Sequence, residues 1–250
     1  MAGTNGRNGP VLSLVGQERD VAFYVREAQQ AGGPVLVLGA GMGRVAWALA
    51  ARGLETVAVE PSEVMFRTAD ARRGAESPET AARMRLLQVD PRALRLDERF
   101  PIVLAPQNAL ALSATLDDVD AMLATVRHHL AEGGVFVFDV LNPRRDMPAP
   151  EVPEDRWQPL EGVEPPRPIF APHLRERTRT AEGTTEGIRR LRLRHFTVEE
   201  IDQALREADF VATERFGSFD RRPFDPQDAV QVVVAVRAES GGGAEGGQGG

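Results

Sequence analysis

The stretch from Val35 to Ala50, VLVLGAGMGRVAWALA, constrains the fold of this chain more than any other. An apolar, strand-like run enters a turn that contains Gly39, Gly41 and Gly43, and an amphipathic helix pattern follows. Glycine is needed where the backbone turns tightly or must approach a ligand closely. The N-terminus of the helix behind the turn offers free N–H groups and partial positive charge. We therefore expect a phosphate- or nucleoside-bearing ligand here, although a purely structural turn has the same pattern.

Strand-like and helix-like segments alternate on both sides of this turn. The expected strands are 34–38, 56–60, 84–90, 101–105 and 135–141, and the expected helices are 18–33, 43–52, 62–73 and 117–131. Continuous apolar strands separated by helices indicate a parallel sheet that is covered on both faces. Because crossovers between parallel strands are right-handed, the pattern predicts a doubly wound α/β fold.

The regular alternation ends after strand 135–141. A Pro-rich stretch leads to two alternating segments at 172–180 and 187–196, and the sequence AEGTTEG between them predicts a β-hairpin insertion. A helix follows, and its start is marked by Thr197 and Glu200, which form a capping box. Phe196 and Ile201 are spaced as the matching hydrophobic staple. Strands near 210–216 and 229–237 close the chain.

Five segments are expected from this pattern. They are a flexible N-terminus at 1–16, a cofactor-binding α/β core at 17–142, a substrate-lid insertion at 143–196, the C-terminal part of the core at 197–238, and a disordered Gly-rich tail at 239–250. The tail has too little apolar surface to fold.

Composition excludes several classes of function. The chain has no cysteine and no lysine, which removes disulfides, thiolate zinc sites, cysteine nucleophiles and catalytic lysines. The histidines and carboxylates show no metal-ligand spacing, so we expect no metal. A net charge of −7 disfavours nucleic acid as a partner. Without a membrane-length apolar run or a signal-peptide pattern, we expect a cytoplasmic protein.

The second expected strand ends in Glu60, whose carboxylate can accept hydrogen bonds from vicinal ribose hydroxyls. It would repel a 2′-phosphate, which disfavours NADP. The glycines follow the spacing G-x-G-x-G, because position 44 is Arg where a dinucleotide fold has its third glycine. A nicotinamide oxidoreductase remains an alternative, which this spacing opposes.

The sequence at this point resembles the class I S-adenosylmethionine-dependent methyltransferases, and more narrowly their small-molecule branch. The resemblance covers about residues 17–237, and the segments that carry it are VLVLGAGMGRVAWALA, VAVEPSEVM, LLQVDPRALRL, FPIVLAPQNAL, HLAEGGVFVFDVLNP and the closing LRHFTVEEIDQALREADF…VQVVVAVR. It implies a Rossmann-like sheet of seven strands whose last strand is antiparallel. It also implies S-adenosylmethionine (AdoMet) as cofactor.

The family pattern, carried onto this sequence, assigns a set of cofactor contacts. Gly39, Ala40 and Gly41 would wrap the methionine part, Glu60 would hold the ribose, Ser62 and Met65 would lie by the adenine, Asp90 would accept from the adenine amino group, and Ala105 and Pro106 would line the floor under the sulfonium. Gly43 and Pro61 belong to the same set.

The chain departs from the family pattern at several positions. Val37 stands where many relatives have an acidic residue, and Pro91, after Asp90, has no N–H to give to the adenine ring. Pro101 and Gln107 also differ from the usual residues. These departures support an alternative, in which the chain is a catalytically silent homologue that serves as a binding or assembly module.

Methyl transfer needs proximity, alignment and exclusion of water more than acid–base groups. The expected reaction transfers a methyl group to a nitrogen or oxygen of a small metabolite. Candidate substrate contacts are Tyr24, Asn108, Asn142 and Arg194, and His195 is the candidate general base. Each has a structural alternative, which for Tyr24 is a packed core aromatic and for Asn142 a turn before Pro143.

Two further patterns bear on partners. Arginines alternate along the expected hairpin, at 175, 177 and 179 and again at 190, 192 and 194. They suit either a solvated face or a lid that meets an anionic substrate or a partner subunit, so a homodimer or a protein partner stays open. His128 and His129 lie near the end of helix 117–131, where we expect a solvated face or a pairing with the helix dipole.

Overall fold

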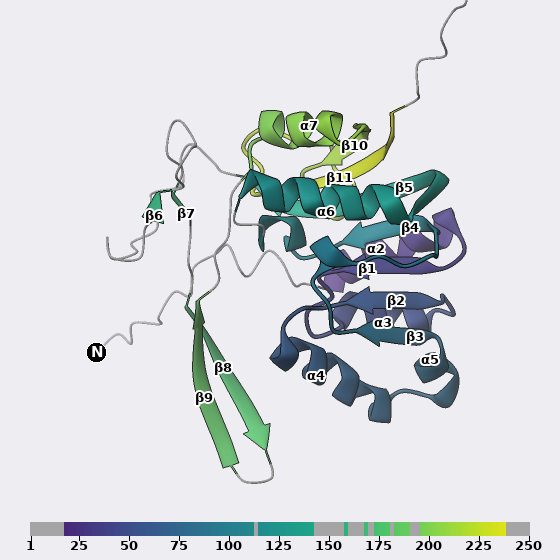
Figure 1. Ribbon diagram of the computed structural model, residues 1–250, viewed down its shortest axis with the longest axis vertical. Coiled ribbons are helices and arrows are strands. Elements are labelled where there is room, and N and C mark those ends of the chain that lie inside the picture. The colour runs from purple at the N-terminus through teal and green to yellow at the C-terminus, as the bar shows by residue number, and fades with distance from the viewer. Residues whose placement is uncertain are drawn as a thin grey trace, which may run out of the picture.

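The computed structural model describes residues 18–112, 115–142, 158–159, 168–169, 173–180, 183–190 and 196–238. Its central feature is an open seven-stranded sheet in the strand order β10-β11-β5-β4-β1-β2-β3 (Figure 1). The strands are β1 (Val35–Leu38), β2 (Thr56–Val59), β3 (Met84–Leu87), β4 (Phe100–Ala105), β5 (Leu130–Leu141), β10 (Phe210–Phe216) and β11 (Val230–Arg237). Among them β11 runs antiparallel to both of its neighbours, β5 and β10. This is the Rossmann-like methyltransferase arrangement that the resemblance implied.

Helices cover both faces of the sheet. The helices of the core are α2 (Glu18–Ala31), α3 (Arg44–Ala51), α4 (Glu63–Ala71), α5 (Pro78–Ala82), α6 (Leu116–His129) and α7 (Val198–Glu207). The apolar stripe of α6 packs with α7 on one face, in the cluster that contains Leu36 and Leu38. Helices α2 and α3 pack on the other face, in the cluster that contains Val35 and Val37. The alternation of strand side chains between the two clusters is the period of two expected of a doubly covered sheet.

The start of α7 confirms the predicted capping box. The Thr197 side chain accepts a hydrogen bond from the Glu200 N–H, and the Glu200 carboxylate accepts one from the Thr197 N–H. The predicted staple residues Phe196 and Ile201 are both about 1% exposed and belong to the same apolar cluster.

Replacing Thr197 with alanine should lower the free energy of unfolding by about 1 kcal/mol, because the Glu200 N–H at the start of α7 loses the hydroxyl that accepts its hydrogen bond. Thr197→Ser keeps the hydroxyl and is the matched control, with an expected change of a few tenths of a kcal/mol. Urea unfolding measures both. Equal stability of the alanine and serine variants would show that the box contributes nothing.

Several element boundaries differ from the sequence prediction. Strand β3 ends at Leu87 instead of at 90, because Asp90 caps a short 3-10 helix, Pro91–Ala93. Helix α6 ends at His129, and β5 begins at once with Leu130. Helix α5, with Ser77 as its cap and Pro78 at its first position, was not predicted.

The predicted hairpin is present, with different strand boundaries. Strands β8 (His173–Thr180) and β9 (Gly183–Arg190) form a two-stranded antiparallel sheet (Figure 1). The prediction that 181–187 forms the connection was wrong, because β9 already starts at Gly183 and pairs it with Thr180. A second small pair joins β6 (Gln158–Pro159) to β7 (Pro168–Ile169). The segments expected at 1–16 and 239–250 lie outside the described residues.

Within the part of the chain that the structure describes, no helix has the length and apolar character needed to cross a membrane.

Candidate functional site

The turn after β1 is built on three glycines with left-handed backbone angles. Their φ values are 71° at Gly39, 56° at Gly41 and 76° at Gly43. A side chain at Gly39 would collide with Ala109, whose Cβ would lie 2.8 Å from the added Cβ. The turn closes when the Gly43 N–H donates to the Ala40 carbonyl at 2.9 Å, and α3 begins directly afterwards. The glycines are therefore required by conformation and by close packing, as the sequence indicated.

Glu60 directly follows β2 and is hydrogen-bonded to this turn. It is 6% exposed, and its Oε2 accepts a hydrogen bond from the Gly41 N–H at 2.8 Å. Its Oε1 accepts from the Ser62 N–H, also at 2.8 Å. A carboxylate has about four acceptor sites, so two remain for a ligand hydroxyl pair. The hydrogen bonds from these two backbone N–H groups fix the carboxylate beside the glycine turn without any ligand.

A hollow of about 100 Å³ opens at the carboxyl ends of the central strands. It is lined by Gly39, Pro61, Asp90, Pro91, Arg92, Ala109 and Met122. These residues follow β1, β2, β3 and β4, and α6 supplies the last of them. The chain order reverses between β1 and β4, and such a switch point is where open α/β sheets bind ligands. We call this hollow, together with the glycine turn and Glu60, the cofactor crevice.

Asp90 lies in the crevice and is paired with a neighbour that the sequence analysis did not single out. The Arg92 side chain donates from Nε to Asp90 Oδ1 at 3.0 Å, and its NH2 group lies 2.6 Å from Oδ2. The guanidinium also reaches Asp118 at the start of α6. Hydrogen bonds from Arg92 hold the pKa of Asp90 below its usual range. Asp90 is therefore an ionised acceptor that is already paired with Arg92.

A buried carboxylate, Asp139 of β5, holds the loop that follows β4. Its Oδ1 accepts from the Gln107 N–H at 2.7 Å, and its Oδ2 accepts from the Asn108 N–H at 2.9 Å. The Tyr24 hydroxyl donates to Oδ1 at 2.5 Å. Burial raises the pKa of Asp139 to about 6, although all three hydrogen bonds favour the charged form. An ionisable group inside the apolar run VFVFDVL is the sequence signal that Asp139 has a specific buried partner.

The predicted substrate contacts Tyr24, Asn108 and Asn142 all have structural partners. Tyr24 has no exposed surface, and its ring packs edge-on against Phe23, so it is the core aromatic that the sequence kept as its alternative. The Asn108 Oδ1 accepts from the Leu141 N–H at 3.1 Å. None of the three side chains lines the cofactor crevice.

Asn142 joins the end of β5 to the loop before β11. Its side-chain amide donates to the carbonyls of Pro226 at 3.0 Å and Asp228 at 2.8 Å. Its Oδ1 accepts from the buried Gln231 amide at 3.3 Å. The residue is 7% exposed, and its three hydrogen bonds hold the end of β5 to the loop before β11 and to β11 itself.

The histidine predictions have mixed outcomes. His195 and Arg194 lie outside the described residues, as do Arg192 of the arginine pattern and the residues around them. The expectation of a solvated face for His129 was wrong, because the ring is fully buried. Its Nε2 accepts from the Leu96 N–H at 2.9 Å, so Nδ1 carries the proton toward the Thr125 carbonyl at 2.8 Å. Burial lowers the pKa of His129.

Two of the residues that depart from the family pattern, Val37 and Pro91, fit their surroundings in the structure. Val37 is fully buried and packs in the apolar cluster under α2 and α3. A buried carboxylate is still present at this end of the sheet, because Asp20 of α2 is 1% exposed and holds the Arg44 guanidinium at the start of α3. Pro91 begins the short 3-10 helix, whose first N–H has no intrahelical partner, so proline is tolerated there.

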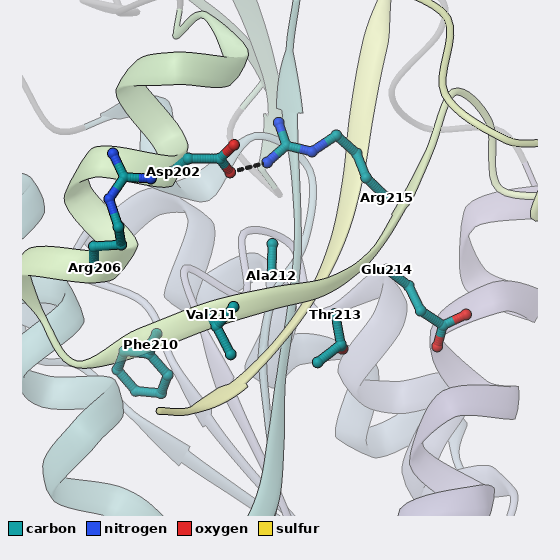
Figure 2. Close-up of a pocket in the computed structure, with 8 residues that line it drawn as sticks. All are labelled: Asp202, Arg206, Phe210, Val211, Ala212, Thr213, Glu214 and Arg215. Carbon is teal, nitrogen blue, oxygen red and sulfur yellow. Dashed lines mark hydrogen bonds and ion pairs between the residues drawn. The ribbon is translucent and has the colours of Figure 1, made fainter. Parts of the chain in front are cut away.

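A larger hollow of about 340 Å³ lies between α7 and the edge strand β10 (Figure 2). Figure 2 shows Asp202 of α7 reaching across to Arg215 of β10, with which it forms an ion pair. Three strands separate β10 from β1 in the sheet, so this hollow is remote from the glycine turn. Among the described residues, no group of three or more histidine, aspartate or glutamate side chains is placed to hold a metal ion.

Comparison with known proteins bears on this geometry. A family described as "Methyltransferase domain" matches residues 36–136, which run from β1 into β5. The structure of the CcbJ methyltransferase from Streptomyces caelestis is 26% identical and superposes with a TM-score of 0.71, over 93% of this chain and 100% of its own. A search of curated protein sequences gave no match.

Two structures with bound cofactor share the fold at lower identity. The glycopeptide N-methyltransferase MtfA, complexed with AdoMet, is 21% identical with a TM-score of 0.60, over 91% of this chain and 95% of its own. AdoMet-bound CalS10, an amino pentose methyltransferase from Micromonospora echinaspora, is 23% identical with a TM-score of 0.55, over 88% of this chain and 89% of its own. The cofactor crevice of this chain presents backbone without a side chain at Gly41 and two further acceptor sites on the Glu60 carboxylate. Residues 36–136 thus match a methyltransferase domain, and the fold of the chain is that of the S-adenosylmethionine-dependent methyltransferases.

Proposed function

We propose that this enzyme transfers the methyl group of AdoMet to a nitrogen or oxygen atom of a small metabolite. The observation that carries the proposal is the cofactor crevice, where the glycine turn and a carboxylate held by two backbone N–H groups meet at the switch point of the sheet. The bound cofactor supplies an electrophilic methyl group on a positively charged sulfur. The chain supplies binding, alignment and exclusion of water.

Individual contacts follow from this assignment. Glu60 would bind the ribose hydroxyls, Asp90 would accept from the adenine amino group, and Pro61, Ser62 and Met65 would lie along the adenine. Gly39, Ala40, Gly41 and Gly43 would face the methionine part, and the buried residues Ala105 and Pro106 would form the floor beneath the sulfur. Ser62 also caps α4, since its Oγ is 3.5 Å from the Met65 N–H.

An amine is the acceptor that this crevice fits best. Of the described residues that line the hollow, Asp90 and Arg92 are the ones that titrate, and they are paired with each other. A neutral amine attacks without a base, whereas a hydroxyl group needs a proton acceptor nearby. The same fold is found in the glycopeptide N-methyltransferase MtfA and in CalS10, an amino pentose methyltransferase. The acidic chain, with a net charge of −7, also favours a small cationic or neutral acceptor over nucleic acid.

The test has two stages. Calorimetry should show micromolar binding of AdoMet and of its demethylated product S-adenosylhomocysteine. Incubation of AdoMet with a panel of small amines, amino sugars and hydroxyl compounds should then release S-adenosylhomocysteine with at least one acceptor, which gains one methyl group by mass spectrometry. Tight binding without turnover on any acceptor would favour the silent homologue. No binding at millimolar ligand would overturn the proposal.

A further inference from the structure

The loop that follows β4 has an unusual backbone. Gln107 and Asn108 both have a φ of 60°, in the left-handed region that residues with a side chain rarely adopt. Two such residues in succession cost free energy, and they persist only where the surroundings hold them. Backbone strain of this kind is concentrated at functional sites. The groups that hold Gln107 and Asn108 in this conformation are therefore candidates for a functional role.

This loop borders the cofactor crevice. Its next residue, Ala109, lines the hollow and contacts the glycine turn at Gly39. The Gln107 side chain lies near Gly41, with 3.8 Å between its Oε1 and the place where a Cβ on Gly41 would be. In the assignment above, Ala105 and Pro106 immediately before the loop lie beneath the sulfur. The strained residues thus stand at the end of the crevice where the methyl group would be transferred.

The restraint comes from one carboxylate. Asp139 accepts from both strained residues, one backbone N–H on each oxygen, at 2.7 Å and 2.9 Å. Tyr24 of α2 fixes the same carboxylate through its hydroxyl at 2.5 Å. Asp139 and Tyr24 are both fully buried, so no water competes for these bonds. A neutral side chain at 139 could not accept from both N–H groups and from the hydroxyl together.

We propose that Asp139 is a positioning residue for methyl transfer, which holds the 107–108 loop against the methyl end of bound AdoMet, and that Tyr24 sets the position of its carboxylate. The inference rests on the proposed function, because it takes the place of the cofactor's sulfur from that assignment. Asp139 has no surface in the crevice and acts through the loop, so it is not a catalytic residue. Its role differs from that of Glu60, which serves the ribose end.

The proposal gives the site a dependence on pH. Only the ionised carboxylate accepts all three hydrogen bonds, and burial places the pKa of Asp139 at about 6. The groups that face it are Tyr24 and Asp20 of α2, the backbone N–H groups of the loop, and apolar Val232 of β11. Asp20, whose charge raises this pKa, is itself paired with Arg44 of α3. As the pH falls through about 6, protonation should release the loop and weaken contacts at the methyl end.

Sinefungin and S-adenosylhomocysteine make a suitable pair of probes, because they differ at the position of the methyl group. Sinefungin carries an amino group there, and S-adenosylhomocysteine carries nothing. The ratio of their dissociation constants therefore reports on the methyl end, while contacts to adenine, ribose and the amino-acid end cancel. Calorimetry of the full chain between pH 5 and pH 8 measures this ratio without any acceptor.

In Asp139→Asn we expect sinefungin to bind on the order of 10-fold more weakly, with a change in S-adenosylhomocysteine affinity of less than about threefold. The wild-type ratio should change with a midpoint near pH 6, and the variant should lack this transition. Tyr24→Phe removes a hydrogen bond that favours the charged carboxylate, so its midpoint should move to higher pH.

The outcomes separate the two proposals. If wild-type protein binds neither probe, the proposed function fails. If the wild type binds both but the ratio is flat across pH, or if Asp139→Asn keeps the wild-type ratio, the positioning role of Asp139 is overturned. Should Asp139→Asn fail to fold, the Tyr24→Phe variant tests the proposal, because it leaves the Asp139 carboxylate in place. If its midpoint in the pH dependence of the ratio equals that of the wild type, Tyr24 does not position the carboxylate and ionisation of Asp139 does not control the methyl end.

Discussion

Replacement of Glu60 with alanine should raise the dissociation constant for AdoMet about a hundredfold, a loss of about 3 kcal/mol. The substitution removes the acceptor for the two ribose hydroxyls, and a hydrogen bond to a charged group contributes about 1.5–3 kcal/mol. It also releases the N–H groups of Gly41 and Ser62 from their shared partner, so the glycine turn loses its link to β2. Calorimetry at a fixed pH and ionic strength measures the change.

Two variants sharpen this measurement. Glu60→Gln keeps one acceptor oxygen and should fall between the wild type and the alanine variant. Glu63→Ala is the matched control, because Glu63 lies three residues away in the first turn of α4, is exposed and pairs with Arg67. Its removal should change the dissociation constant by less than about twofold, since exposed ion pairs contribute little. If Glu60→Ala binds AdoMet as tightly as Glu63→Ala does, the ribose assignment is wrong.

Replacement of Gly39 with alanine should lower the free energy of unfolding by about 3 kcal/mol. The φ of 71° is unfavourable for any residue with a Cβ, at a cost of about 1–2 kcal/mol. The new Cβ would also lie 2.8 Å from the Ala109 Cβ, so the turn and the loop after β4 must move apart. Urea unfolding gives the change in stability, and calorimetry should show a parallel loss of AdoMet affinity because both segments border the crevice.

Gly41 offers the comparison that isolates the collision. Its φ is 56°, but the nearest atom to an added Cβ is the Gln107 Oε1 at 3.8 Å. Gly41→Ala should therefore cost only the backbone strain, about 1 kcal/mol. Combining Gly39→Ala with Ala109→Gly removes the clash and should recover part of the lost stability. Equal losses for Gly39→Ala and Gly41→Ala would show that close packing against Ala109 is unimportant.

The parts of the fold that depend on local pattern could be predicted from the sequence. The five parallel strands, the glycine turn and the start of α7 all follow from apolar periodicity and from turn or capping residues within a short window. Glu60 could be placed by the same reasoning, because it ends a strand next to the glycine turn. The pairing of the hairpin could not, since the sequence of strands 173–180 and 183–190 has few apolar residues and no alternating apolar pattern that would predict which residues pair.

The hydrogen-bond partners of buried polar groups could not be predicted from the sequence. Tyr24 and Asp139 are 115 positions apart in the chain, and neither local spacing nor composition relates them. The burial of His129 depends on the backbone of Leu96, in a loop that packs over the end of α6. Helical periodicity reports which face of a helix is apolar, but it does not report which loop will cover a polar residue. Arg92 was missed because its importance comes from reaching both Asp90 and Asp118.

The position of the antiparallel strand β11 determines where this chain can be truncated without loss of the fold. The family match ends at residue 136, within β5, yet β5 pairs with β11 from Val135 to Leu141, mostly beyond that boundary. A fragment that ends at residue 142 would retain every proposed AdoMet contact, but the edge of β5 that pairs with β11 would be exposed. The Asn142 amide would also lose both of the carbonyls to which it donates. The smallest part of the chain that folds on its own should therefore include β11, and a truncation that ends at residue 142 should aggregate through the exposed edge of β5.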